Sequence, residues 1–424
     1  MSCAFKDGMG REAKLILVFT IVLWSMISRA GVLLESTATL PKGIYSPNLI
    51  FGSYSGLSEK YNSGGQIQGV ADQYRINLSG KFLATLDPKF KELVRALNNL
   101  SPEEHLGDRA TGGTLTFKAS PKIEYFVPTL SYGITSNLSI GFGIPIVHFQ
   151  NSMQAYAQGN FEAVSRYAHG LSPDIDKATQ KLAEKAANLQ GSVSGILNTK
   201  GYKSLQNEDW TAPGDLQISA VYRYYTSYRW RLAIRPYIQI PTGRTDDPDD
   251  LADIATGGQP AIGIYSIHEL QILPRWALVS AVGYQYNIED SATMRVPASS
   301  DDHLPDLDRK ETVSRQTGNT VFLEGGFSYK PYRPLEFRIV YDYTTKDPDW
   351  YQGNHPDWNY GLLSTDTGSQ TNQIKGLVEF STVNYYMQKS FSIPFLLGYI
   401  YGNTFYAVNA PNEITNQLYM RMFF

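Results

Sequence analysis

The chain has 424 residues, of which 13% are aromatic and 36 are glycine, and its 37 basic and 40 acidic residues leave a net charge of -3. So balanced a charge gives no reason to expect a nucleic-acid-binding protein. The slightly negative mean hydropathy (-0.27) excludes a bundle of membrane helices and fits strands with one apolar and one polar face.

The first thirty residues form a predicted signal peptide. Lys6, Arg11 and Lys14 precede the apolar run 15–27 (LILVFTIVLWSMI), and Ser28-Arg29-Ala30 has the small-x-small pattern of a cleavage site. The run is shorter than the 20 or so residues of a membrane-spanning helix. We therefore expect residues 1–30 to be removed and residues 31–424 to form one domain. The only cysteine, Cys3, would leave with the leader, which rules out disulfides and cysteine-based metal or catalytic sites in the mature chain.

The mature chain alternates apolar and polar residues with a period of two. In residues 230–240, one face carries Trp230, Leu232, Ile234, Pro236, Ile238 and Ile240, and the other carries Arg231, Ala233, Arg235, Tyr237 and Gln239. This is the pattern of a strand that faces lipid on one side and a lumen on the other. Twelve such segments lie at about 45–55, 115–134, 138–150, 216–225, 230–240, 260–272, 275–288, 318–330, 335–343, 374–387, 391–407 and 415–424.

The connections between these segments alternate between short and long. Tight turns are expected at 135–137, 227–229, 273–274, 331–334 and 388–390, and long polar segments at 56–114, 151–213, 242–259, 289–317 and 346–373. Outer-membrane barrels have short periplasmic turns and long external loops. The sequence therefore predicts an all-β fold, a transmembrane up-and-down antiparallel barrel of about twelve strands, in the outer membrane of a Gram-negative cell.

Two of the long loops carry helix signals. Asp87-Pro88 and Ser172-Pro173 each place a capping residue before a proline in the first turn, and apolar stripes follow, from Phe90 to Leu100 and from Ile175 to Leu189. These short helices either fold back over the barrel mouth or lie on the surface without a gating role.

The chain ends in a strand whose apolar face is Leu418, Met420, Met422 and Phe424. A terminal phenylalanine after alternating apolar residues resembles the signal of proteins that the barrel-assembly machinery handles. We expect these four residues to serve as an assembly signal and to contact outer-membrane lipid, with lipopolysaccharide around the external rim.

Several charged residues fall on the polar, inward faces of the predicted strands: Arg223, Arg231, Arg235, Glu324, Glu336, Arg338 and Asp342. Buried charges are tolerated only when they pair or meet water. A twelve-stranded barrel is intermediate between small barrels filled by side chains and wide porins. The lumen is therefore either a wet passage lined by these residues or an interior that their ion pairs fill.

Short motifs spread over the mature chain carry a family resemblance. They are Leu40-Pro41-Lys42-Gly43, residues 125–146 (YFVPTLSYGITSNLSIGFGIPI), Pro213-Gly214-Asp215-Leu216, Ile240-Pro241-Thr242-Gly243 and Thr256-Gly257-Gly258-Gln259. In this the chain resembles the outer-membrane family named for the meta-pathway of phenol degradation, a relative of the FadL-type channels. The resemblance implies a monomeric barrel that passes small hydrophobic or aromatic molecules, with a side opening as a further feature. The Asn-Pro-Ala motif and the long N-terminal plug of the FadL branch are not found in the sequence.

Three other readings remain open. His303 beside Asp301 and Asp302, or His355 near Asp357, imitates the rim of a barrel protease, whereas the mid-sequence His and Ser of barrel phospholipases are not matched at His148. The acidic loop 246–253 (DDPDDLAD) offers oxygen ligands for a divalent cation but lacks the EF-hand pattern. A structural or adhesive barrel with a closed lumen is the third alternative. We expect a passive channel for a small hydrophobic substrate, with no cofactor and no catalysis.

Overall fold

The computed structural model describes residues 34–72, 76–79, 88–100, 103, 106–109, 111–158, 173, 197–198, 200–300, 302 and 304–424. The predicted signal peptide, residues 1–30, lies outside the described residues, as do Asp301 and His303 and nearly all of the second predicted loop helix.

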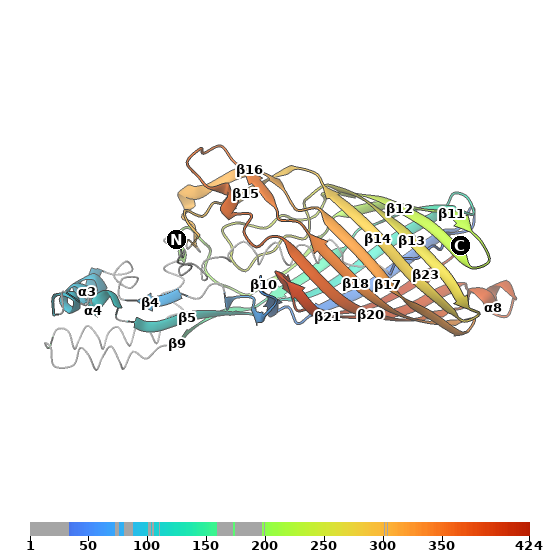
Figure 1. Cartoon of the computed structure of the whole chain (residues 1–424), viewed down its shortest axis with the longest axis horizontal. Coiled ribbons are helices and arrows are strands. Elements are labelled where there is room, and N and C mark those ends of the chain that lie inside the picture. Colours follow the sequence, from blue (N-terminus) through green and yellow to red (C-terminus); the bar gives the residue numbers. More distant parts are fainter. Residues whose placement is uncertain are drawn as a thin grey trace, which may run out of the picture.

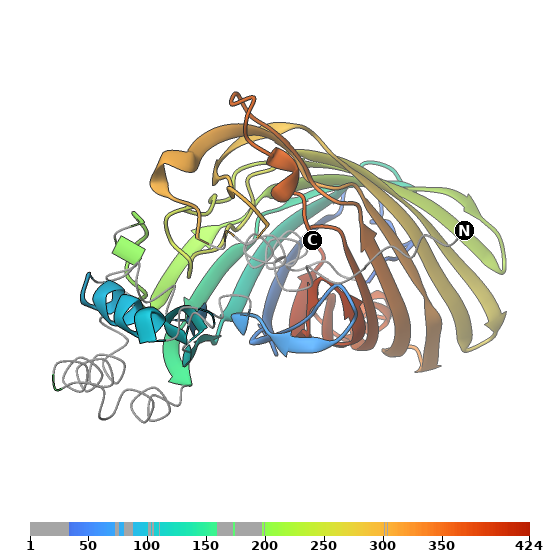
Figure 2. The same ribbon diagram turned by 60° about the vertical axis from the view of Figure 1, so that its left-hand side comes forward.

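Twelve antiparallel strands close into a barrel, as predicted from the alternation (Figures 1 and 2). Each strand pairs with its neighbours in the chain, and β6 closes the ring by pairing with β1. The strands are β1 (Tyr45–Ser55), β6 (Lys122–Gly133), β7 (Leu138–Gly143), β11 (Leu216–Thr226), β12 (Trp230–Ile240), β13 (Ala261–Leu273), β14 (Trp276–Asn287), β17 (Thr320–Tyr332), β18 (Leu335–Lys346), β20 (Ser369–Ser381), β21 (Phe395–Val408) and β23 (Ile414–Met422).

The two faces of the wall differ as the period-two pattern requires. On β18 the outward Ile339 is 65% exposed and the inward Val340 is 2% exposed. Outward side chains on the other strands, such as Ile238, Phe327 and Leu418, are exposed to a similar degree, so an apolar belt surrounds the barrel. Such a belt is the surface that hydrocarbon solvates.

Two positions of the wall are each built from two consecutive strands, so the segment 138–150, predicted as one strand, forms two. β7 is followed by β8 (Ile146–Asn151), and both pair with β6; β10 (Glu208–Pro213) precedes β11 in the next position and pairs with β8. The breaks fall at Pro145 and Gly214, where the Gly214 N–H donates to the Pro145 carbonyl over 2.7 Å. Proline cannot donate in a ladder, so a break in the strand is its expected place.

Most short connections lie at one end of the barrel, here called the turn end, and most long ones lie at the other, the loop end. The chain terminus after β23 and the turns β6–β7, β11–β12, β13–β14 and β17–β18 lie at the turn end (Figure 1). The predicted turn at 388–390 is wrong, because β20 stops at Ser381 and a short helix, α8 (Val383–Met387), fills a longer connection to β21. The residues of α8 are apolar enough to resemble the end of a strand in sequence. In the structure, Tyr385, Tyr386 and Met387 lie together and are exposed.

The loop end carries three small sheets, one of which belongs to a projecting arm. One sheet contains β2 (Glu59–Tyr61), β3 (Ile67–Gly69) and β22 (Ala410–Pro411), and another contains β15 (Asp290–Arg295), β16 (Lys310–Gln316) and β19 (Trp350–Gln352), beside the 3-10 turns η2 (Leu307–Arg309) and η3 (Tyr360–Leu362). The arm, β4 (Ile76–Ser79), β5 (Thr111–Ala119), β9 (Met153–Gln158), α3 (Pro88–Leu100) and α4 (Leu106–Arg109), projects away from the barrel (Figure 1).

Helix α3 confirms the signal at Asp87-Pro88, and it lies on the projecting arm rather than over the barrel mouth. Among the described residues, every helix is too short or too polar to cross a membrane.

Candidate functional site in the barrel lumen

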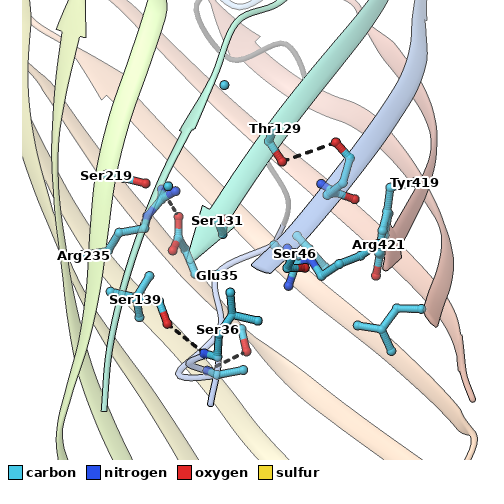
Figure 3. Close-up of a pocket in the computed structure, with 18 of the residues that line it drawn as sticks. Glu35, Ser36, Ser46, Thr129, Ser131, Ser139, Ser219, Arg235, Tyr419 and Arg421 are labelled. Carbon is cyan, nitrogen blue, oxygen red and sulfur yellow. Dashed lines mark hydrogen bonds and ion pairs between the residues drawn. The ribbon is translucent and has the colours of Figure 1, made fainter. Parts of the chain in front are cut away.

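Residues 34–40, which precede β1, run inside the barrel; we call them the lumenal segment. Figure 3 shows Glu35 and Ser36 within the ring of strands, facing side chains from several of them. Leu34, Glu35 and Thr37 are buried, although no strand of the barrel includes them. A piece of the chain's own N-terminal region therefore occupies the lumen.

Glu35 anchors the deep end of the lumenal segment. Its carboxylate forms an ion pair with Arg235 of β12, and both side chains are mostly shielded from solvent, at 5% and 16% exposure. Its backbone N–H donates to Glu324 Oε2 over 3.3 Å, and its carbonyl accepts from Arg338 Nη1 over 3.3 Å. Side chains from three strands, β12, β17 and β18, thus hold Glu35. They satisfy the polar groups of Glu35 that burial would otherwise leave unpaired.

The remaining contacts of the lumenal segment are neutral or charge-assisted hydrogen bonds toward the turn end. Thr37 Oγ1 donates to Glu269 Oε2 over 2.8 Å, and Thr39 Oγ1 donates to the Ser136 carbonyl over 2.8 Å. The Leu40 N–H donates to Ser139 Oγ over 2.7 Å. The segment is held by specific bonds along its whole length, so its place in the lumen is encoded by the chain.

The structure places all seven charged residues named from the sequence on the inward face. Arg223, Arg231, Arg235, Glu336 and Arg338 line a lumenal cavity, whereas Glu324 and Asp342 lie deeper, against Glu35 and Lys375. Most are paired: Arg231 with Glu269 at 3.4 Å, Lys375 with Asp342 at 2.9 Å, and Arg338 with Glu336. Ion pairs thus fill part of the lumen, and a cavity remains beside them.

That cavity has a volume of about 470 Å³ and occupies the turn-end half of the lumen, against the lumenal segment (Figure 3). This size falls within the range of small-molecule sites. Six basic side chains line it against five acidic ones: Arg223, Arg231, Arg235, Lys330, Arg338 and Arg421 against Glu35, Asp215, Glu269, Glu336 and Glu379. Leu377, Leu396 and Ile400 add an apolar wall.

Toward the loop end the lumen is packed with apolar side chains. Leu34 of the lumenal segment belongs to the same packed cluster as Val279, Val340, Leu377 and Ile400, and the cluster continues through Tyr125 and Phe149 to Ile254 under the loops. Tyr125 lies flat over Gly52 of β1, where any side chain would collide with its ring. The interior is therefore mainly polar on the turn-end side of the lumenal segment and apolar on its loop-end side.

Three of the motifs singled out in the sequence meet beside the wall break. The buried Asp215 carboxylate accepts from the N–H groups of Gly243 and Gly258 over 2.8 and 2.9 Å, and from Gln239 Nε2 over 2.8 Å. The Thr242 hydroxyl donates to the Gly214 carbonyl over 2.9 Å. Gly258 has a φ of 107°, a conformation that other residues rarely adopt. The three motifs therefore form a hydrogen-bonded cluster that fixes the strand ends around the break.

Comparison with known families agrees with these motifs. Residues 101–393, more than half of the chain, match the family model described as "Putative MetA-pathway of phenol degradation". The chain belongs to this family. The matched residues include the wall break, the hydrogen-bonded cluster beside it and most of the charged side chains that face the lumen. No sequence among the curated proteins matches it significantly.

Two solved structures were compared with this family member. An outer-membrane channel from Pseudomonas putida F1 is 12% identical, with 93% of this chain and 100% of that chain covered and a TM-score of 0.51. The toluene transporter TodX from Pseudomonas putida is 10% identical, with 91% and 89% covered and a TM-score of 0.30. At such identities the first likeness shows the barrel fold, in agreement with the twelve strands.

The histidines considered as catalytic candidates are placed as follows. His148 contacts the Thr211 hydroxyl at 3.1 Å, and the ring of His355 stacks on Trp358 with centroids 4.1 Å apart. One further Ser–His pair is not among these candidates from the sequence. On β13, Ser266 Oγ and His268 Nε2 lie 2.9 Å apart, two residues apart on one strand.

This pair faces outward, because the intervening Ile267 is buried in the lumen at 2% exposure. Its direct neighbours across the strands are Ile234 and Val282 for Ser266, and Leu232 and Ser280 for His268. None of these four supplies the carboxylate or amide that orients the base of a catalytic triad. A mutual hydrogen bond also satisfies both polar groups on an apolar surface.

Protein cations pair with the acidic loop 246–253. Arg244 binds Asp253 through two bonds of 2.6 and 2.7 Å, Lys310 binds Asp249 at 2.6 Å, and Lys203 binds Asp247 at 3.0 Å. Burial raises the pKa of Asp250 in the same loop. Among the described residues, no cluster of metal-ligating side chains is found. The divalent-cation hypothesis therefore gains no support from the loop's geometry.

The C-terminal residues close the barrel. Leu418, Met420 and Met422 lie on the outward face of β23, and the N–H and carbonyl of Phe424 both bond to Tyr45 at 2.9 Å. The lumenal segment, by contrast, was not foreseen from the sequence. Its only signal is Glu35, a lone acidic residue in an otherwise uncharged stretch after the predicted leader.

Proposed function

We propose that this chain is an outer-membrane channel for the passive uptake or efflux of small hydrophobic or aromatic molecules. One observation carries the proposal: a segment of the chain occupies the lumen between a ligand-sized cavity and an apolar interior, and bonds that can break and reform hold it there. A permanently closed barrel would have no need for a cavity under a detachable segment.

The surroundings of the lumenal segment suggest how passage works. Its contacts are polar on the cavity side, whereas Leu34 reaches the apolar cluster that leads to the loop end. Release of the segment would expose this apolar cluster to the cavity without unfolding any strand. The family description, with its reference to phenol degradation, and the channel name of the Pseudomonas putida relative support aromatic cargo and location in the outer membrane. If the leader is cleaved after Ala30, the lumenal segment lies close to the new N-terminus, and only a few preceding residues would have to move with it.

The test uses a Gram-negative host that lacks other channels for hydrophobic compounds. Cells that produce the chain should take up dilute radiolabelled toluene faster than cells of the same host that do not produce it. A Thr37→Cys, Glu269→Cys variant in a Cys3→Ser background allows a reducible bis-maleimide to pin the lumenal segment. Pinning should abolish the added uptake, and reduction should restore it.

Three results distinguish the alternatives. Uptake that ignores the crosslink contradicts a gating role for the lumenal segment. Entry of small sugars in liposome swelling indicates a general porin. A chain that adds neither uptake nor conductance is a structural barrel.

We also propose that the chain is not an enzyme, and the Ser266–His268 pair provides the sharpest check. Purified barrel should not hydrolyse a chromogenic fatty-acyl ester. Hydrolysis that disappears in Ser266→Ala but persists in Ser280→Ala would assign lipolytic activity to the outward face of β13 and overturn this part of the proposal.

A further inference from the structure

One wall of the lumenal cavity presents a cation with no carboxylate partner. Arg421 of β23 lines the cavity, and within the described residues no carboxylate lies at ion-pair distance from its guanidinium. The nearby Glu379 accepts a hydrogen bond from the Tyr419 hydroxyl instead. Arg223 also lacks a carboxylate partner, but its guanidinium donates to the Ser136 carbonyl and to Asn137 Oδ1, whereas no hydrogen bond from the Arg421 guanidinium is found among the described residues.

The polar side chains next to Arg421 are also incompletely satisfied. Asn48 of β1 is its direct partner across the strands, and Ser46 lies two residues along on the same face. Ser46 Oγ and Asn48 Oδ1 are buried, at 1% and 3% exposure of their residues, and neither has a hydrogen-bond partner. Figure 3 shows Ser46 beside Arg421 in the cavity. Buried polar atoms without partners are uncommon in native proteins, and a bound ligand is one reason for them.

The opposite flank of Arg421 is apolar. Its direct partner on β21 is Leu396, and Ile400 and Leu377, which are themselves paired across the strands, continue this wall away from the guanidinium. All three line the same cavity. The cavity thus combines one cationic point with a polar flank and an extended apolar wall.

From this arrangement we infer that the cavity is a binding site for a small amphipathic carboxylate, such as an aromatic acid. The carboxylate accepts from the Arg421 guanidinium and the Ser46 hydroxyl, and the apolar body lies along Leu396, Ile400 and Leu377. A guanidinium matches a carboxylate in charge and in planar geometry. The inference deepens the proposed function, on which it rests, by naming the class of cargo that the lumen holds longest.

The experiment measures binding of radiolabelled benzoate to the purified full-length barrel in detergent by equilibrium dialysis, with neutral benzamide as the matched ligand. Benzoate should bind with higher affinity than benzamide. Arg421→Gln should weaken benzoate binding about tenfold or more, the scale of one lost charge-assisted hydrogen bond, and leave benzamide binding unchanged. Arg333→Gln, which removes the same charge from an exposed turn at the turn end, is the control and should bind benzoate like the unmodified chain.

Because Arg421 lies in the closing strand, each variant is first tested for heat-modifiable migration, which reports a folded barrel. If Arg421→Gln does not fold, Ser46→Ala replaces it and should weaken benzoate binding severalfold while sparing benzamide. Equal affinity for benzoate and benzamide, or benzoate binding that survives both substitutions, overturns the inference.

Failure of the inference and failure of the channel proposal are distinguishable. If toluene enters cells through the chain but purified barrel does not prefer benzoate, only the carboxylate site is wrong. If benzoate binds at Arg421 but neither benzoate nor toluene enters cells, the site stands and the transport proposal fails.

Discussion

Replacing Glu35 with alanine should release the lumenal segment without unfolding the barrel. The substitution removes the ion pair with Arg235 and leaves that guanidinium only 16% exposed. Breaking a buried pair costs about 3–5 kcal/mol, and the remaining cation–π contact of Arg235 with Tyr265, at 4.7 Å, together with partial access to the cavity, recovers part of this. We expect a net loss of about 2–3 kcal/mol of docking free energy, which raises the equilibrium constant for release roughly 30- to 150-fold.

Cysteine labelling measures this release directly. Thr37 is 1% exposed, so a Thr37→Cys side chain in a Cys3→Ser background should react with a polar maleimide only when the segment leaves the wall. Adding Glu35→Ala should raise the labelling rate by the factor above and increase single-channel conductance. Ser36→Ala is the control, because among the described residues the Ser36 hydroxyl bonds only within the segment, where it accepts from the Ala38 N–H at 3.2 Å. An unchanged rate in Glu35→Ala, or an equal rise in Ser36→Ala, would refute the assigned anchor.

Four further predictions concern the wall and the loops. Ile339→Arg should cost about 2–4 kcal/mol in denaturant titrations of the barrel in vesicles, because an outward residue near mid-strand faces hydrocarbon; a variant of unchanged stability would contradict that orientation. Val340→Arg should also destabilise, by about 1–3 kcal/mol, because the inward position is packed rather than wet, and a neutral effect would indicate water there. Deleting Phe424 removes both backbone bonds to Tyr45 and should lower the heat-modifiable yield, so full yield would remove its role in closure. Burial lowers the pKa of Lys60 in the loop sheet from 10.5 to about 7, so the unfolded state binds more protons between these values. The free energy of unfolding should therefore rise from about pH 7 toward 10.5. Lys60→Met should flatten this rise, and a rise that persists in Lys60→Met would show that another group causes it.

The number, order and facing of the strands were predictable from the sequence, because alternation is a local property that each strand carries by itself. The segments 45–55 and 230–240 were placed with their exact bounds. The connection after β20 was not, because an apolar turn helix and a strand end share the same composition over a few residues. The Ser266–His268 pair was missed for a different reason: two polar residues on a lipid-facing strand look like noise in the alternation until their 2.9 Å contact is seen.

The sequence by itself thus determined a barrel wall, its inward charges and its closing strand, since periodicity fixes which side chains share a face. Only the tertiary structure decided what fills the lumen. The bonds that hold the lumenal segment join residues far apart in the chain, such as Glu35 with Arg235 and Arg338, and no local pattern records them. The same holds for Arg421, which has no ion-pair partner among the described residues. Its surroundings are set when β23 pairs with β1 and β21, and the nearby Glu379 accepts a hydrogen bond from Tyr419. Pairing of charges across a lumen is a property of the closed ring, and it exists only once the twelve strands have met.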